Sequence, residues 1–363
     1  MFPPLRVEIS CRVLDDGEAA DMKAMILETL TRLDTEKQPL RLVTLPDPVP
    51  GDREVLIRVS ACDVCHTELD EIEGRTPPAS LPVVLGHEVV GEVVSWGRSA
   101  TRFQEGDIVG VGWIFDACGK CAFCRQGLEN LCPGFRATGR DANGGYAELM
   151  VVPEDFAHPI PPVFTPTEAA PFLCAGAIGY RSLRLSQIEN GQSLGLTGFG
   201  ASAHLVLKMV RHRFPDTEVF VFARSEAEQA FARELGAVWS GPAEDASPRK
   251  LDAIIDTTPA WKPVVEALKN LESAGRLVIN AIRKESADKE ELLKIDYPAH
   301  LWMEKEIKSV ANVARADIHE FLRLAAEIPL KPEVQEFALD EANQALVELK
   351  ERKIRGAKVL RIA

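Results

Sequence analysis

The chain has 363 residues, which is enough for two domains that each bury a core. Its 55 acidic and 42 basic residues give a net charge of −13, and this balance argues against nucleic acid or an anionic membrane as a partner, because both need clustered Lys and Arg. No apolar run approaches the ~20 residues that would cross a bilayer.

Residues 1–21 are expected to form an N-terminal extension. From Leu40 to about Ala170, short alternating apolar runs are broken by Gly and Pro, a pattern typical of short strands in a β-rich lobe. The expected strands there are Glu54–Ser60, Val89–Ser95, Asp107–Val111 and Tyr146–Val152.

Between Glu189 and Asn280, strands alternate with helices, which predicts a doubly wound parallel sheet. The expected strands are Ser193–Thr197, Glu218–Ala223, Ala253–Asp256 and Arg276–Asn280, and the expected helices are Ala201–Arg213, Glu226–Gly236 and Trp261–Leu271. After Leu301 come the run Glu306–Asn312 and two further expected helices, Asp317–Glu327 and Leu339–Lys350.

Half of the cysteines lie within fifteen residues, where Cys118, Cys121, Cys124 and Cys132 form the pattern C-x2-C-x2-C-x7-C. Four thiolates at this spacing are typical of a closed, tetrahedral structural zinc site. Two disulfides, or buried small apolar residues, are the alternatives. No signal peptide is recognised, so a reduced cytoplasmic compartment is expected, and there clustered thiols favour metal.

The scattered residues Cys65, His87 and Cys174 suggest a second metal site. Two thiolates and one imidazole would leave the fourth place of a zinc ion open for water or substrate, as catalytic sites do. Each residue alone is weak support, since a single histidine is more often a core or surface residue. Only a fold can bring the three together.

A glycine-rich segment follows the expected strand Ser193–Thr197 and begins a helix. Gly198, Gly200 and Ala203 fit G-x-G-x-x-A, a variant of the dinucleotide-binding fingerprint of Rossmann domains. The first Gly makes the turn, the second lets the backbone approach a pyrophosphate, and the small third residue packs helix on strand.

The motif Gly86-His87-Glu88-x2-Gly91-x5-Gly97-x2-Ala100 resembles the zinc signature of the medium-chain zinc-dependent alcohol dehydrogenases. The cysteine pattern and the glycine-rich loop follow in the family's order. The resemblance implies a GroES-like catalytic domain over 22–176 with a zinc lobe at about 113–135, a Rossmann coenzyme domain over 177–302, and a return to the catalytic domain over 303–363.

The resemblance also assigns roles to residues. It implies that Cys65, His87 and Cys174 hold a catalytic zinc, with Glu88 as a possible fourth ligand. Thr67 matches the hydroxyl that starts a proton relay, and His66 falls among the coenzyme-binding positions. Glu68, where Asp is usual, could orient the His87 ring.

Several positions depart from the family pattern or are ambiguous. Asp70 stands where many relatives carry the outer His of the relay, Asp63 replaces a usual Gly, and Ile178 replaces a Thr that faces the nicotinamide. Cys62 resembles half of a C-x2-C pair, but we expect it to be a buried small residue. Trp113 and Ile114 match positions that narrow the substrate pocket, although ordinary core packing explains them nearly as well.

The end of the second expected strand of the parallel sheet bears on the coenzyme. NAD enzymes usually carry Asp or Glu there for the ribose hydroxyls, whereas this chain has Ala223, Arg224 and Ser225. Arg224 and Ser225 can hydrogen-bond a 2′-phosphate, and the segment resembles that of NADP-dependent relatives, so NADP(H) is predicted over NAD(H). The alternative is that Arg224 is a solvated side chain stacking on adenine.

Together these features predict a zinc-dependent, NAD(P)-linked alcohol dehydrogenase or aldehyde reductase with two zinc ions per subunit. A homodimer or homotetramer is expected. The alternatives are a zinc-free double-bond reductase and a non-catalytic NADPH-binding protein on the same scaffold.

Overall fold

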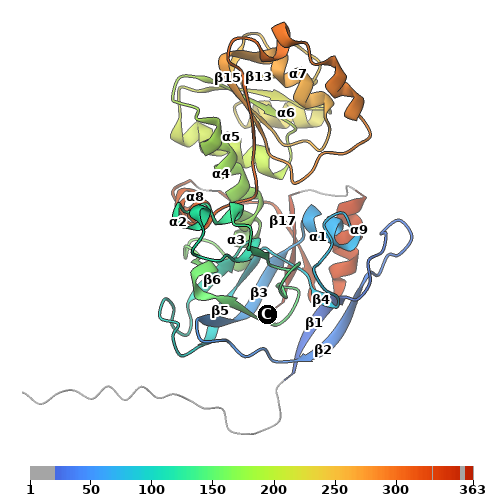
Figure 1. Ribbon diagram of the computed structural model, residues 1–363, viewed down its shortest axis with the longest axis vertical. Coiled ribbons are helices and arrows are strands. Elements are labelled where there is room, and N and C mark those ends of the chain that lie inside the picture. The colour runs from blue at the N-terminus through green and yellow to red at the C-terminus, as the bar shows by residue number, and fades with distance from the viewer. Residues whose placement is uncertain (1–20, 329, 352–355, 363) are drawn as a thin grey trace, which may run out of the picture.

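The computed structural model describes residues 21–328, 330–351 and 356–362, and the chain forms two lobes (Figure 1). The predicted extension therefore lies outside the described residues except for Asp21, which begins a strand; Cys11 lies outside them as well.

The first lobe, called the β-rich lobe, is built on a seven-stranded sheet. Its strands are β3 (Glu54–Asp63), β5 (Val89–Trp96), β6 (Ile108–Val111), β9 (Leu149–Pro153), β10 (Ala157–Pro159), β17 (Val334–Ala338) and β18 (Ala357–Arg361). They run in the order β10-β6-β5-β3-β18-β17, with β9 also paired to β3. Leu360 pairs with Cys62, so the C-terminal strands complete a sheet begun by the N-terminal part of the chain.

Shorter elements surround this sheet. A second sheet has the order β2-β1-β4, and the hairpin β7-β8 brackets the cysteine cluster. These strands are β1 (Asp21–Leu27), β2 (Leu40–Pro46), β4 (Val83–Val84), β7 (Ile114–Asp116) and β8 (Arg136–Ala137). The helices of this lobe are α1 (His66–Ile72), α2 (Ala122–Arg125), α3 (Pro166–Ala169) and α9 (Ala342–Lys350). Short 3-10 turns are η1 (Glu129–Leu131), η2 (Glu154–Phe156), η3 (Ala170–Leu173) and η6 (Leu339–Glu341).

The second lobe, called the parallel-sheet lobe, confirms the predicted doubly wound sheet. Six parallel strands run in the order β13-β12-β11-β14-β15-β16, and β11 at its centre is buried at every residue. The strands are β11 (Ser193–Thr197), β12 (Glu218–Phe222), β13 (Trp239–Gly241), β14 (Leu251–Asp256), β15 (Leu271–Ile279) and β16 (Glu306–Ser309), and the helices are α5 (Ala201–Arg213), α6 (Glu226–Glu234) and α7 (Lys262–Asn270), with short turns η4 (Lys289–Lys294) and η5 (Tyr297–Leu301).

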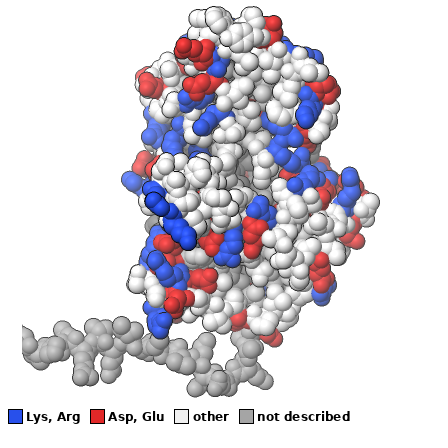
Figure 2. Space-filling model, viewed as in Figure 1, with Lys and Arg blue, Asp and Glu red and all other residues white. Residues whose placement is uncertain are grey.

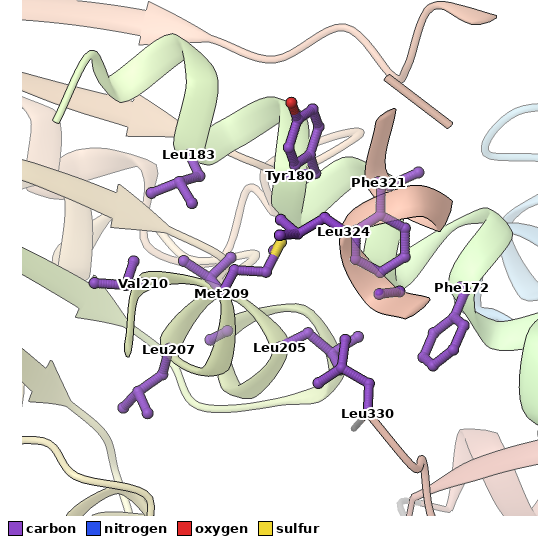
Figure 3. Close-up of a cluster of buried hydrophobic side chains, with 14 of the residues drawn as sticks. Phe172, Tyr180, Leu183, Leu205, Leu207, Met209, Val210, Phe321, Leu324 and Leu330 are labelled. Carbon is purple, nitrogen blue, oxygen red and sulfur yellow. The ribbon is translucent and has the colours of Figure 1, made fainter. Parts of the chain in front are cut away.

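Two helices join the lobes through one apolar core. α4 (Ala175–Ser186) leads from the β-rich lobe into the parallel-sheet lobe, and α8 (Arg315–Glu327) packs beside it. Figure 3 shows Phe321 of α8 near Phe172, while Met209 of α5 points toward α4. The same cluster of buried side chains therefore reaches into both lobes and joins them on this side of the molecule.

The surface agrees with the composition. On the face in Figure 2, basic and acidic side chains are interspersed. Among the described residues, no helix has the length and apolar character needed to cross a membrane.

Candidate active site and coenzyme loop

The fold brings Cys65, His87 and Cys174 together, although 109 residues separate the first from the last. Their side-chain ligand atoms, with a carboxylate oxygen of Glu88, all lie within 4.8 Å of one another. Cys65 is the N-cap of α1, and Cys174 lies between η3 and α4. His87 follows Gly86, whose φ of +95° suits glycine, and a Cβ there would meet the Tyr146 ring at 2.4 Å.

The orientation of the imidazole is set by Glu68. The ring atom Nδ1 of His87 lies 2.5 Å from Oε1 of Glu68, and the other carboxylate oxygen accepts the backbone N–H of Cys65 at 2.9 Å. His87 is 1% exposed, yet its Nε2 has no hydrogen-bond partner. A buried ring nitrogen left free beside two thiols is what a metal ligand requires.

The electrostatics of the site favour a cation. A hydrogen bond from the thiol of Cys174, helped by His87, holds the pKa of Cys65 well below its usual value. Burial, followed by repulsion from Asp63, raises the pKa of Glu88 well above its usual range. Two thiols, an imidazole and a carboxylate form a donor set that suits zinc, and a divalent cation would offset their negative charge.

The other predicted catalytic residues lie on α1. The hydroxyl of Thr67 is 3.8 Å from Sγ of Cys65, and His66 is exposed. Asp70 is 4% exposed, and its carboxylate binds two guanidinium groups, those of Arg75 and Arg283.

The structure confirms that Cys62 is a buried small residue, with no exposed surface and no place in either ligand group. Trp113 and Ile114 are buried as well, and the Trp113 ring packs against Phe135 with centroids 5.2 Å apart. Ile178 is half-buried in the first turn of α4.

The four clustered cysteines form a separate group whose sulfur atoms also lie within 4.8 Å of one another. All are free thiols; Cys121 and Cys124 have their Sγ atoms 3.5 Å apart. Backbone N–H groups of Lys120 and Cys121 lower the pKa of Cys118 to about 6, so one thiolate forms easily even without metal. Turns at Gly119 and Gly127, each with φ of +70°, let the loop wrap around this point.

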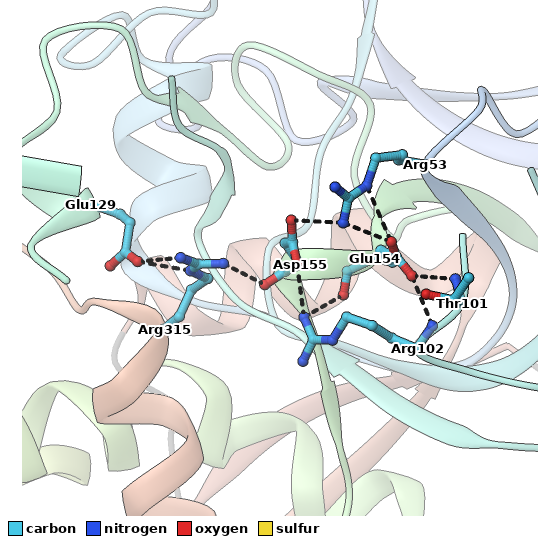
Figure 4. Close-up of polar contacts among 7 residues, drawn as sticks. All are labelled: Arg53, Thr101, Arg102, Glu129, Glu154, Asp155 and Arg315. Atoms are coloured by element: carbon cyan, nitrogen blue, oxygen red, sulfur yellow. Dashed lines mark hydrogen bonds and ion pairs between the residues drawn. The ribbon is translucent and has the colours of Figure 1, made fainter. Parts of the chain in front are cut away.

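Ion pairs attach this cysteine lobe to the rest of the molecule (Figure 4). Arg315, the first residue of α8, donates two hydrogen bonds to Oε1 of Glu129, at 2.8 and 2.6 Å. Its guanidinium also lies over the Phe156 ring at 5.0 Å. Glu129 is 3% exposed and stands three residues before Cys132, so this contact fixes the lobe against the helix that joins the two larger lobes.

The predicted glycine-rich loop lies at the carboxyl end of β11, where parallel sheets of this kind bind ligands. Gly198 has φ of +77°, and a Cβ on it would meet the Thr257 hydroxyl at 2.8 Å. Gly200 is the N-cap of α5 and has open space around its missing Cβ, while Ala203 is fully buried. A phosphate can therefore approach the backbone at Gly200 and the N-terminus of α5.

At the end of β12, Ala223 is buried and Arg224 is exposed. Ser225 caps α6 and is already engaged, because its hydroxyl accepts the N–H of Glu228 at 3.2 Å and donates to the Glu228 carboxylate at 2.9 Å. Of the two side chains predicted to bind a 2′-phosphate, Arg224 is thus the one that makes no hydrogen bond or ion pair to another described residue, and it is exposed.

Sequence reasoning missed a buried polar group beside this loop. Asp256 at the end of β14 is fully buried and accepts the hydroxyl of Thr197 at 2.7 Å. The ammonium of Lys284 binds the same carboxylate and donates to the Thr258 carbonyl at 2.7 Å. An Asp at the end of a predicted strand could have identified Asp256 as a candidate site residue. The sequence spacing gives no indication that Lys284 is its partner.

With this geometry in place, comparison with known proteins identifies similar chains. Residues 51–162 match the alcohol dehydrogenase GroES-like domain. A probable alcohol dehydrogenase of Mycobacterium tuberculosis is 40% identical over 329 residues, which are 89% of this chain and 93% of that protein. An alcohol dehydrogenase of Geobacillus stearothermophilus is 31% identical over 335 residues, or 90% of this chain and 96% of that protein. A solved structure of a cinnamyl alcohol dehydrogenase from Sorghum bicolor superposes with a TM-score of 0.79 at 27% identity, covering 94% of this chain and 98% of the other.

Proposed function

The chain belongs to the medium-chain, zinc-type alcohol dehydrogenase family, and from this premise we propose that a zinc ion held by Cys65, His87 and Cys174 activates its substrate. The protein is an oxidoreductase that transfers a hydride between an alcohol or aldehyde and a nicotinamide coenzyme. The observation that carries the zinc proposal is the buried Nε2 of His87, which makes no hydrogen bond, lies 3.6 Å from Oε1 of Glu88 and is grouped with two thiols.

Each residue of this site has a defined task. A zinc ion at this point would supply Lewis-acid polarisation of the substrate oxygen. Glu68 keeps the imidazole oriented, and Glu88 offers a carboxylate oxygen that can serve as a fourth ligand. The hydroxyl of Thr67, 3.8 Å from Sγ of Cys65, would lie beside a substrate oxygen bound at this ion. There it would accept the substrate's proton in a hydrogen bond while passing its own proton outward to water or another acceptor.

Asp70 is the predicted outer member of the proton relay that begins at Thr67. Asp70 stays a predicted relay member, but its carboxylate already accepts hydrogen bonds from Arg75 at 2.5 Å and from Arg283 at 3.0 Å. Both carboxylate oxygens of Asp70 are therefore already engaged by guanidinium groups.

We propose NADP(H) as the preferred coenzyme. Ala223 removes the carboxylate that would repel a 2′-phosphate, and the free guanidinium of Arg224 can bind one by charge-assisted hydrogen bonds. Ser225 contributes less than its position suggests, because Glu228 holds its hydroxyl and adds negative charge nearby. Gly198, Gly200 and Ala203 support pyrophosphate binding, and His66 stays a predicted coenzyme contact.

A second copy of the chain is the proposed partner. β16 is the last strand of its sheet, and Glu306, Ile307, Lys308 and Ser309 are all exposed, which leaves an open edge. An antiparallel, two-fold pairing centred on Ile307 would set Glu306 opposite Lys308 of the other copy, so the edge is self-complementary in charge. Sedimentation of an Ile307→Asp variant tests this: monomers are expected, and an unchanged oligomer would contradict the proposal.

Zinc content and a substrate panel distinguish the proposal from its rivals. Wild type, purified without chelators, should contain zinc and oxidise primary or secondary alcohols with NADP⁺. Reduction of activated carbon–carbon double bonds without zinc would favour the double-bond reductase. NADPH binding with no turnover on either panel would favour the non-catalytic alternative. The substrate panel also gives the preferred alcohol and the direction of reaction.

A further inference from the structure

We propose that Arg283 is a positioning residue, which joins helix α1 of the active site to the coenzyme-binding sheet and so sets the geometry of hydride transfer. Its partner is Asp70, which lies 213 residues earlier in the other lobe. Nε of Arg283 donates to Oδ2 of Asp70 at 3.0 Å, and its second nitrogen donates to Oδ1 at 3.2 Å. This two-point contact fixes direction as well as distance.

On the β-rich side, the contact is made to a rigid element. Asp70 lies in α1, the same short helix that Cys65 caps and that carries Thr67 and Glu68. The Asp70 side chain is 6% exposed, and Arg75 holds it from within the same lobe at 2.5 Å. A displacement of Asp70 would therefore move α1 and the residues that face the substrate.

On the parallel-sheet side, the anchor is the neighbouring residue, Lys284. The Lys284 side chain is 7% exposed, and its ammonium binds the fully buried carboxylate of Asp256, the Thr258 carbonyl at 2.7 Å and the Ala260 carbonyl at 3.0 Å. Asp256 in turn accepts the hydroxyl of Thr197, the residue before the Gly198 turn. Two adjacent residues thus reach in opposite directions, one into the coenzyme sheet and one into the active-site helix.

This polar link differs in kind from the apolar connection between the lobes. The apolar core at α4 and α8 lies across the molecule from α1 in Figure 1, and it buries large side chains such as Phe172 and Phe321. The Arg283 side chain is 34% exposed, so water can compete for its contact with Asp70. The two lobes are therefore joined by an apolar core at α4 and α8 and, separately, by the Asp70–Arg283 pair, whose contact water can reach.

The pair matters for the reaction because the two reactants are held by different lobes. The substrate oxygen belongs near Cys65 and Thr67, whereas the coenzyme belongs at Gly198 and Gly200. Hydride transfer needs the reacting atoms about 3–3.5 Å apart, and small misplacements cost large factors in rate. Coenzyme binding depends mainly on one lobe. Loss of the pair should therefore slow hydride transfer more than it weakens coenzyme binding.

The test compares Arg283→Ala with Arg75→Ala, which removes the other guanidinium from the same carboxylate without crossing between lobes. For Arg283→Ala we expect the single-turnover rate of hydride transfer to fall about tenfold or more. The deuterium isotope effect on kcat should rise, and the coenzyme Kd should change by less than about threefold. Arg75→Ala should raise the isotope effect less than Arg283→Ala does, because Asp70 keeps its contact with the parallel-sheet lobe. Equal effects of the two substitutions, or none from Arg283→Ala, would overturn the proposal.

Two further variants keep the proposal falsifiable if Arg283→Ala does not fold. Arg283→Lys retains the charge but not the two-point contact, and should recover only part of the hydride-transfer rate. Asp70→Asn should show the same raised isotope effect, whereas a relay role for Asp70 would instead change the pH profile and leave Arg283→Lys like wild type. Because the proposal rests on the proposed function, wild type is measured first: no wild-type turnover would defeat that function, while turnover insensitive to these variants would defeat the positioning role alone.

Discussion

Nδ1 of His87 lies 2.5 Å from Oε1 of Glu68, and this contact decides which ring nitrogen faces the two thiols. Glu68 engages Nδ1, so Nε2 is the ring nitrogen left for a metal. Burial opposes a charge on the ring, but Glu68 and Cys65 outweigh it and raise the pKa of His87 well above its usual value, so a metal that binds at Nε2 must displace a proton. The ring is buried between the helix that begins after Cys65 and the strand that begins at Val89. One buried glutamate thus prepares the site before any metal arrives.

Replacing this glutamate should weaken metal binding more than it weakens the fold. We expect Glu68→Gln to lower zinc affinity by roughly 10–100-fold, because the amide neither fixes the tautomer nor strengthens the ligand. Competition with a chromogenic chelator measures this. Glu71→Gln is the matched control, a buried carboxylate on the same helix that has no hydrogen bond to His87. Equal losses in both variants would mean that Glu68 has no specific role.

The two ligand groups predict two zinc ions per subunit, with separable roles. Cys121→Ser should lose one zinc and lower the melting temperature or cause aggregation, since closed thiolate sites contribute folding energy directly. Cys62→Ala, which alters a buried cysteine outside both groups, should keep both ions. A Cys121→Ser protein with full stability and no turnover would place catalysis at the four-cysteine group, which contradicts its assignment as a structural site.

Coenzyme choice should follow the charge at the end of β12. Ala223→Asp should favour NAD(H), because the new carboxylate repels a 2′-phosphate and offers the ribose hydroxyls an acceptor. Arg224→Ala should reduce the NADP(H) preference without creating an NAD(H) site, and salt should reduce the preference in wild type. The measurement is kcat/KM with both coenzymes. A wild type that prefers NAD(H) tenfold, about 1.4 kcal/mol, would refute the assignment.

The buried carboxylate of Glu73, at the end of α1, should make the free energy of unfolding depend on pH in the acid range. Burial works against the charge of Glu73, but hydrogen bonds from Lys350 and Arg75 outweigh it and lower its pKa to about 2. A lowered folded-state pKa stabilises the protein above the unfolded value and ceases to do so as the pH falls through the folded one. Glu73→Gln should cost about 1–3 kcal/mol at pH 7.

That cost should stay constant above about pH 5 and shrink between pH 4.5 and 2. Urea unfolding of both metal-free proteins across this range tests the sign, with Glu336→Gln as an exposed control. A difference that grows with acid would contradict the assigned pKa.

Local patterns in the sequence were enough to predict most helices and strands of the parallel-sheet lobe. β11 and α5 have the predicted bounds, because a buried strand, a glycine turn and an amphipathic helix each leave a strong local signal. The predicted strand over Arg276–Asn280 begins earlier, at Leu271. The run Glu306–Asn312, expected within the return to the catalytic domain over 303–363, instead contributes β16 (Glu306–Ser309) to the parallel sheet, where it pairs with β15. Strand ends depend on pairing partners, which periodicity does not contain.

The elements that sequence reasoning missed are those defined by distant contacts. β18 has a partner in β3 about 300 residues earlier. α1 is a short helix whose first turn begins His66-Thr67-Glu68, so it presents no apolar stripe there that periodicity could detect. The same limit applies to the site. The ligands could be proposed from a family motif, but the link from Asp70 to Arg283 and the buried pair of Asp256 with Lys284 exist only in the folded chain.

The most direct test of the account is zinc content and turnover measured together in Cys65→Ala. Cys65 belongs to one ligand group, and Cys118, Cys121, Cys124 and Cys132 form the other. We therefore predict that the variant keeps one zinc per subunit, folds, and loses alcohol oxidation. Wild-type turnover in a Cys65→Ala protein that holds a single zinc would contradict the central claim that this site activates the substrate.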